Sequence, residues 1–236
     1  MKKMKLICLP YAGGNKYSYR ALEPFIKDTF DMITVELPGR STRISEPSLD
    51  NVADIIEDVL EQIKDHLFDG YILYGHSMGT LIGTVLLYEL KERKLPLPQH
   101  AVFTGRGAPQ KSKSSKQRHL LQGEEFKEEL IKIGGCPDEL LENEELMNFF
   151  SPIIRADFKA METFSFEVKE KIDVPMTIIV GDEEDISDEK LYAWEELCSV
   201  GISIFKLPGN HFFIHEHYKS LAKLFKTTGI SKTELL

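Results

Sequence analysis

Apolar residues in this chain follow two alternating patterns. Short continuous apolar runs predict buried strands at residues 6–9, 32–37, 71–74, 101–104, 176–180 and 202–207. Between them, apolar residues at helical spacing predict helices at about residues 19–30, 50–67, 78–93, 188–198 and 217–225. The clearest is residues 50–67, where the apolar positions share one face and mostly charged residues fill the other. This alternation predicts an α/β fold, with a mostly parallel sheet covered by helices on both faces.

The alternation stops after residue 104 and resumes at residue 176. Residues 111–118 (KSKSSKQR) are polar and basic, and residues 123–165 have helical patterning throughout. We therefore expect one domain over residues 1–236, with a helical lid inserted at about residues 106–165. The large apolar residues of this insertion are Phe126, Leu130, Leu146, Phe149, Phe150, Ile153, Phe158 and Phe164. Most of them should pack the lid helices onto the body, while some could line a pocket for an acyl chain.

The composition fits a protein with a full core and no basic surplus. The chain has 236 residues, of which 42% are hydrophobic, and a formal net charge of −9. That charge argues against nucleic acid as a partner, and no apolar segment is long enough to span a membrane. Three cysteines at no metal-like spacing fit a reducing cytosol better than a disulfide framework. We expect a cytoplasmic monomer.

Residues 75–79 (GHSMG) contain the pattern Gly-x-Ser-x-Gly, formed by Gly75, Ser77 and Gly79. The bare pattern is only suggestive, because it also arises by chance in chains of this length. Its setting is more specific, since a predicted buried strand precedes it and a predicted helix follows it, as in the nucleophile elbow of serine hydrolases. Ser77 is therefore the candidate nucleophile, held on a sharp turn beside a helix N-terminus.

A serine nucleophile needs a base, and His211 is the best placed of the seven histidines. It follows the last predicted strand directly, so it belongs on the same sheet edge as Ser77. α/β-Hydrolases carry nucleophile, acid and histidine in that order along the chain, and His211 satisfies the order. A zinc site with His215 and His217 is the weaker interpretation, because the segment leaves a loop and no further ligand stands nearby. We expect no metal.

The acid should come from the loop after the strand at residues 176–180. Residues 181–186 read GDEEDI, and one of the four successive carboxylates should point inward while the others remain solvated. An oxyanion hole is also required, built from backbone N–H groups aimed at the developing charge. The amide of Met78 follows the nucleophile and is one candidate. The amide of Ala12, in the glycine-containing turn at residues 10–14 (PYAGG), is the other.

Several further stretches give the chain a family resemblance over nearly its whole length. The chain resembles the type II thioesterases that accompany nonribosomal peptide and polyketide synthetases. The stretches that carry the resemblance are LPYAGG at residues 9–14, ELPGR at 36–40, GHSMG at 75–79, IGGCP at 133–137, ENEELM at 142–147, RADF at 155–158 and GNHFF at 209–213.

This resemblance implies an α/β-hydrolase fold with a helical lid, and hydrolysis of acyl groups from the phosphopantetheine arm of acyl or peptidyl carrier domains. Such an activity clears misprimed or stalled synthetases. The resemblance also implies Ser77 as nucleophile, His211 as base, and Ala12 and Met78 as oxyanion donors. No cofactor is expected on the protein, because the phosphopantetheine arrives with the substrate.

The sequence departs from the family pattern in the acid loop. The family carries Gly-x-x-Asp there, and counting from Gly181 without a gap places Glu184 at the position of the aspartate. Asp185 keeps the residue type but requires the loop to bulge by one residue. A glutamate serves as the acid in some hydrolases. We expect Asp185, with Glu184 as the alternative and Asp157 in the lid as a distant third candidate.

Two other functions stay open from the sequence. One is a small carboxylesterase or lipase that uses the same machinery on oxygen esters, and the other is a non-catalytic carrier-binding subunit. A separate question is where a carrier would dock on an acidic protein. The dense basic stretch formed by Lys111, Lys113, Lys116 and Arg118, with Arg106 just before it, is either a docking surface or a solvated loop.

Overall fold

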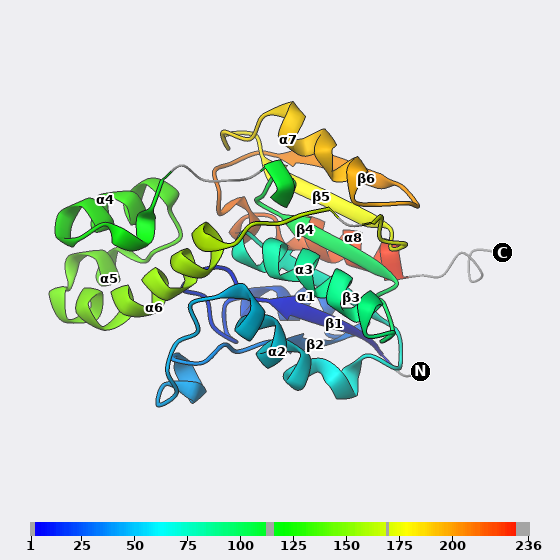
Figure 1. Cartoon of the computed structure of the whole chain (residues 1–236), viewed down its shortest axis with the longest axis horizontal. Helices are drawn as coiled ribbons and strands as arrows, with labels where there is room; N and C mark the ends of the chain where they lie inside the picture. The colour runs from blue at the N-terminus through cyan, green and yellow to red at the C-terminus, as the bar shows by residue number, and fades with distance from the viewer. Residues whose placement is uncertain (1–2, 112–115, 169, 230–236) are drawn as a thin grey trace.

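The computed structural model describes residues 3–111, 116–168 and 170–229, and a parallel sheet forms its centre (Figure 1). The strands are β1 (Met4–Leu9), β2 (Phe30–Thr34), β3 (Tyr71–His76), β4 (His100–Thr104), β5 (Met176–Gly181) and β6 (Ile202–Leu207). They lie in the order β2-β1-β3-β4-β5-β6, and each neighbouring pair is parallel. The predicted parallel α/β sheet is confirmed.

Helices cover both faces of the sheet (Figure 1). One face packs against α2 (Val52–Ile63), α3 (Met78–Glu92) and α7 (Asp188–Tyr192), and the other against α1 (Glu23–Ile26) and α8 (Tyr218–Gly229). Helix α2 buries the apolar face expected from its sequence, with Val52, Ile55, Ile56, Val59, Leu60 and Ile63. Each face of the sheet therefore has its own apolar core.

The insertion between β4 and β5 contains α4 (Gly123–Ile133), α5 (Asp138–Glu142) and α6 (Glu144–Thr163). These helices stand together beyond the carboxyl end of β1 (Figure 1). Their small core consists of Phe126, Leu130, Leu141, Ile154 and Phe158. Helix α4 ends at two glycines with positive φ, Gly134 at 81° and Gly135 at 78°, a conformation that glycine adopts without steric cost.

Several predicted elements differ from the structure in extent. The helix expected at residues 19–30 is only a 3₁₀ turn (Arg20–Leu22) followed by α1. Strand β2 begins at Phe30, because its residues pair with β1 from Met4 onward and that pairing ends at Thr34. The helix expected at residues 188–198 divides into α7 and a 3₁₀ turn (Ala193–Glu196). In each case tertiary pairing or packing overrides the local pattern.

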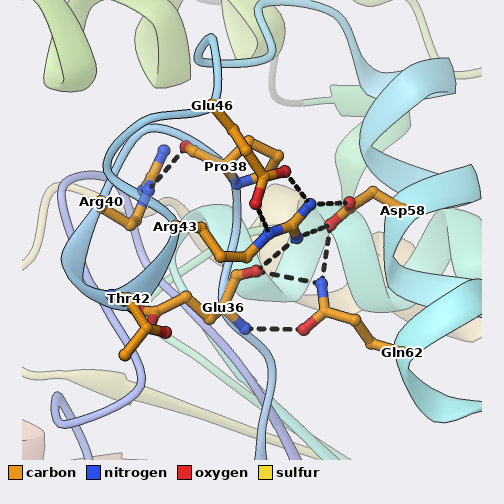
Figure 2. A network of polar contacts seen from close by, with 8 residues as sticks. All are labelled: Glu36, Pro38, Arg40, Thr42, Arg43, Glu46, Asp58 and Gln62. Atoms are coloured by element: carbon orange, nitrogen blue, oxygen red, sulfur yellow. Dashed lines mark hydrogen bonds and ion pairs between the residues drawn. The ribbon is translucent and has the colours of Figure 1, made fainter.

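A polar network fixes the loop between β2 and α2 (Figure 2). The guanidinium of Arg43 contacts the carboxylates of Glu46 and Asp58 at 2.5–2.8 Å, and donates to the Glu36 carbonyl at 2.9 Å. Asp58 lies on α2, so the network ties the loop to that helix. Arg40 extends from the same loop. The Arg43 amide donates to the Arg40 carbonyl at 2.8 Å, so the network also holds the backbone of Arg40.

We expect Arg43→Ala to destabilise the protein by about 1–2 kcal/mol, because it removes charge-assisted bonds and leaves the partly buried carboxylate of Asp58 without a positively charged partner. That loss corresponds to a fall in the thermal midpoint of about 2–8 °C for a chain of this size. Arg93→Ala is the matched control. Arg93 also pairs with two carboxylates, Glu57 and Glu89, but its side chain is 38% exposed, against 24% for Arg43. Equal midpoints for the two variants would contradict a supporting role for the network.

Candidate active site

The strand, sharp turn and helix predicted around Ser77 are present. Ser77 joins β3 to α3 with φ 53° and ψ −108°, a strained backbone conformation for a residue with a side chain. A Cβ atom on Gly75 would lie 2.3 Å from the carbonyl oxygen of Gly79, and one on Gly79 would lie 2.5 Å from that of Leu9. Both glycines are therefore required by the close approach of three backbone segments.

Hydrogen bonds from β4 hold this turn. The Ser77 amide donates to the Thr104 carbonyl at 2.9 Å. The buried hydroxyl of Thr80, in the first turn of α3, lies 3.0 Å from the Gly75 carbonyl and 2.9 Å from that of Thr104. The strained serine is thus held by its own amide and by the Thr80 hydroxyl, both of which bond to the Thr104 carbonyl.

His211 follows β6 and reaches the serine. Its Nε2 lies 2.9 Å from Ser77 Oγ, and its Nδ1 lies 2.6 Å from Glu184 Oε1. A carboxylate only accepts hydrogen bonds, so the proton of the neutral imidazole sits on Nδ1 and Nε2 is free to accept from the serine hydroxyl. This is the geometry required of a nucleophile, a base and an orienting acid.

The structure contradicts the expectation that Asp185 is the acid, because Glu184 and not Asp185 contacts His211. The loop forms a tight turn without a bulge, in which the Glu184 amide donates to the Gly181 carbonyl at 3.2 Å. The Gly181 amide in turn donates to Glu184 Oε2 at 2.7 Å, which holds the second oxygen of the carboxylate. The side chain of Glu184 is 6% exposed, whereas Asp185 is exposed to solvent. Counting from Gly181 without a gap against the family pattern Gly-x-x-Asp therefore identifies the carboxylate that contacts His211.

The two amides predicted to bind the oxyanion are available. Met78 is the first residue of α3, so its N–H lies in the first turn, where no intrahelical acceptor exists. Neighbouring amides after β1 are occupied: Gly13 donates to Asp157 Oδ2 at 2.7 Å and Gly14 to the Tyr11 carbonyl at 2.8 Å. Within residues 3–111, 116–168 and 170–229, the amides of Ala12 and Met78 have no hydrogen-bond acceptor.

A cavity of about 520 Å³ opens over Ser77 and His211. Its wall includes residues 183–186 of the acid loop and Phe158 and Met161 of α6. An adjoining cavity of about 240 Å³ shares Arg106, Met161 and Glu162 with the first and extends toward Phe164. Of the eight large apolar residues in the insertion, Phe158 and Phe164 line these cavities. Phe126, Leu130 and Phe158 belong to the insertion's own core, whereas Leu146 and Phe149 are exposed.

A family model described as "Thioesterase domain" matches residues 4–228 of the chain. The chain belongs to this thioesterase family.

Individual relatives agree with this assignment. The gramicidin S biosynthesis protein GrsT of Aneurinibacillus migulanus is 32% identical over 215 residues, which cover 91% of this chain and 84% of GrsT. Among solved structures, ClbQ from the colibactin NRPS/PKS pathway superposes with a TM-score of 0.90 at 28% identity, covering 96% of this chain and 97% of ClbQ. The type II thioesterase BorB from the borrelidin biosynthetic cluster gives 0.88 at 25% identity, covering 96% and 93%. The resemblance inferred from the sequence is confirmed.

The remaining histidines near the C-terminus of the thioesterase have other partners. Nδ1 of His215 lies 2.7 Å from the Tyr218 hydroxyl, and Nε2 of His217 lies 2.9 Å from the Pro208 carbonyl. No group of three or more His, Cys, Asp or Glu side chains that could hold a metal ion occurs in the part of the chain that the structure describes. Over the same residues, no helix is long and apolar enough to cross a membrane.

The buried imidazole of His76 packs next to the imidazole of His211. Its ring centroid lies 5.0 Å from that of His211, and its Nδ1 lies 3.0 Å from the Thr104 hydroxyl. Burial, reinforced by the proximity of His211 and His215, holds the pKa of His76 well below its usual value. His76 is therefore a neutral packing group at working pH, which keeps a second positive charge away from the base.

Asp157, the third candidate for the acid, pairs with Arg40 and not with His211. Its carboxylate makes a two-pronged ion pair with Arg40, with both N···O distances at 2.8 Å. The stretches ELPGR and RADF, far apart in sequence, thus meet in the folded thioesterase. Both stretches are recognisable in the sequence, but the ion pair between them is not. Neither stretch alone indicates that Arg40 binds Asp157.

The basic stretch considered for carrier docking is largely paired within the protein. Lys116 and Arg118 both contact the carboxylate of Glu129 on α4, and Arg118 also contacts Glu162 on α6. Arg106 lines the two cavities, and burial together with the nearby Arg118 lowers its pKa to about 10, so it stays charged at neutral pH. Lys113 lies outside the described residues. These pairings connect the entrance of the insertion to its helices.

We expect Glu184→Gln to lower kcat for thioester hydrolysis by about 10²- to 10⁴-fold, because an amide neither fixes the Nδ1 tautomer nor stabilises the imidazolium. Asp185→Asn is the matched control, and it should leave kcat within about twofold because Asp185 is exposed and does not contact His211. Steady-state kinetics on one thioester substrate compares the two variants. A large loss in Asp185→Asn with an unaffected Glu184→Gln would reverse the assignment.

Proposed function

We propose that this thioesterase hydrolyses acyl groups from the phosphopantetheine arm of acyl or peptidyl carrier proteins. In that role it clears misprimed or stalled intermediates during nonribosomal peptide or polyketide synthesis. The observation that carries the proposal is the hydrogen-bonded series of Ser77, His211 and Glu184, all three of which line one cavity. The pathway class is supported by the names of GrsT and ClbQ.

In the first half of the reaction, His211 Nε2 takes the proton of the Ser77 hydroxyl as Oγ attacks the thioester carbonyl carbon. The carbonyl oxygen becomes an oxyanion, and the amides of Ala12 and Met78 donate to it. The C–S bond then breaks, His211 returns the proton to the departing pantetheine sulfur, and the acyl group remains on Ser77 as an ester.

In the second half, a water molecule occupies the place of the thiol. His211 removes its proton as the water oxygen attacks the ester carbonyl, and the same two amides again hold the oxyanion. Collapse of this intermediate breaks the bond to Ser77 Oγ, which regains its proton from His211, and the carboxylic acid leaves. Glu184 stays ionised throughout and stabilises the imidazolium in both halves. Every step uses groups of this chain, so we propose that it requires no metal or cofactor.

The oligomeric state and the location of the protein are two further parts of the proposal. All groups of the site come from one chain, and we propose that the protein acts as a monomer. Cys8, Cys136 and Cys198 are free thiols, which supports a cytoplasmic location, where thiols remain reduced.

Two alternatives are separable from this proposal. A carboxylesterase or lipase with the same machinery would hydrolyse an oxygen ester at least as fast as the thioester of the same acyl group. A non-catalytic carrier-binding subunit would bind acyl-carriers without releasing acid. It is disfavoured by the strained Ser77 and its contact with His211, because only chemistry requires that combination.

Ser77→Ala should lower kcat/KM for an acyl-pantetheine thioester by at least about 10³-fold and leave the thermal midpoint nearly unchanged, since one small hydroxyl is lost. His211→Ala should behave alike, and the double variant should be no slower than either single one, because the two residues act as a unit. Ser203→Ala, on the exposed side of β6, is the control and should retain full activity. Wild-type turnover by Ser77→Ala would rule out the serine mechanism.

A further inference from the structure

The ion pair between Arg40 and Asp157 lies where three segments of the chain meet. Arg40 comes from the loop after β2, Asp157 comes from α6, and both contact the turn that follows β1. Asp157 Oδ2 accepts from the Gly13 amide at 2.7 Å, and Arg40 Nη1 donates to the Gly14 carbonyl at 3.1 Å. The side chains of Arg40 and Asp157 are 3% and 0% exposed.

These contacts control the direction of one amide. In a trans peptide the N–H points away from the C=O, so whatever fixes the Tyr11 carbonyl also fixes the Ala12 N–H. The Tyr11 carbonyl accepts from the Gly14 amide at 2.8 Å, and Gly14 is held in turn by Arg40. Asp157 holds the next amide, that of Gly13. The Ala12 N–H is thereby left as the free donor of the turn.

We propose that Arg40 and Asp157 are positioning residues that aim the Ala12 amide at the oxyanion, an inference that rests on the proposed hydrolase function. Neither side chain touches the reacting atoms. They act through Gly13 and Gly14, because Asp157 accepts from the Gly13 amide and Arg40 donates to the Gly14 carbonyl. Oxyanion stabilisation depends steeply on donor placement, so a small rotation of this turn weakens the transition state more than the bound substrate.

Burial of the pair supports this role over a purely stabilising one. Removing two charges from water costs about as much as their attraction returns, so a buried ion pair is a weak source of stability compared with apolar side chains of similar size. What the pair supplies instead is direction, because a guanidinium and a carboxylate in two-pronged contact fix each other's planes.

The same contacts couple α6 to the turn. A Cβ atom on Gly13 would lie 3.0 Å from Ile154 Cγ1, so α6 packs directly against the backbone beside Ala12. Ile154 and Asp157 are one helical turn apart on α6 and approach the turn together. The position of this insertion helix therefore sets the position of the oxyanion donor.

The test replaces the pair by apolar residues of similar size, as Arg40→Met with Asp157→Leu. This double variant removes the contacts to Gly13 and Gly14 without leaving a lone buried charge, so the thermal midpoint should stay within a few degrees of wild type. With a small acyl-pantetheine thioester, kcat should fall about 10- to 100-fold while KM changes less than about threefold. Affinity for an alkyl boronic acid, which forms a tetrahedral adduct on the serine, should fall by a factor similar to that for kcat/KM.

Asp50→Ala with Lys159→Ala is the matched control. Lys159 also lies on α6 and links it to the body through Asp50, but that ion pair is about half exposed and does not reach the turn after β1. Its removal should change neither kcat nor boronic acid affinity.

A stable apolar variant with wild-type kcat and boronic acid affinity would overturn the positioning role. If the apolar variant does not fold, Arg40→Lys decides the question. Lysine keeps the charge but cannot bind both carboxylate oxygens and the Gly14 carbonyl at once, so kcat should fall with KM retained, and an unchanged kcat would overturn the proposal. Failure of the proposed function has a different signature, namely full activity in Ser77→Ala whatever the pair variants do.

Discussion

The close approach of α3 to the carboxyl end of β1 is the constraint on which the site depends. Only glycine fits at residue 79, because a Cβ there would lie 2.5 Å from the Leu9 carbonyl. This contact places the start of α3, which carries the Met78 amide, beside the turn after β1, which carries the Ala12 amide. It also forces Ser77 into a positive φ, at a cost of about 1–3 kcal/mol. Burial of Leu86, Leu87 and Leu90 on α3 contributes about 1.5–3 kcal/mol for each side chain and outweighs that strain.

Parallel strand pairing brings the other groups to the same place. Ala12, Ser77, Glu184 and His211 follow β1, β3, β5 and β6, and the carboxyl ends of parallel strands share one edge of the sheet. The insertion helices stand over that edge, where α6 closes the cavity and, through Asp157, contacts the turn after β1. The sheet therefore sets the positions of the reacting groups, and the insertion lines the cavity above them and contacts the turn after β1.

Much of this arrangement could be predicted from the sequence, because its signals are local or periodic. The strand, Gly-x-Ser-x-Gly and helix in succession located Ser77, and the position of His211 after the last strand located the base. The acid could not be chosen in that way. Glu184 and Asp185 are adjacent carboxylates, and only the turn closed by the Gly181 amide shows which of them faces the histidine.

Ion pairs between residues far apart in the chain could not be predicted from the sequence either. Arg40 and Asp157 are 117 residues apart, and nothing in either neighbourhood specifies the other as its partner. The basic stretch has the same difficulty, since Lys116 and Arg118 look like a free patch until Glu129 and Glu162 are seen opposite them. Composition reports how many charges a chain has, whereas the fold decides which of them remain unpaired.

The most direct test of the account follows an acyl group from the carrier to the enzyme. An acyl-phosphopantetheinyl carrier protein is mixed with the thioesterase, the reaction is quenched at successive times, and mass spectrometry measures both proteins and the peptides of the enzyme. The account predicts that the carrier returns to its free-thiol mass while the acyl mass appears transiently on the peptide that contains Ser77. A carrier that keeps its acyl group, or an acyl mass on a different residue of the enzyme, would contradict the account.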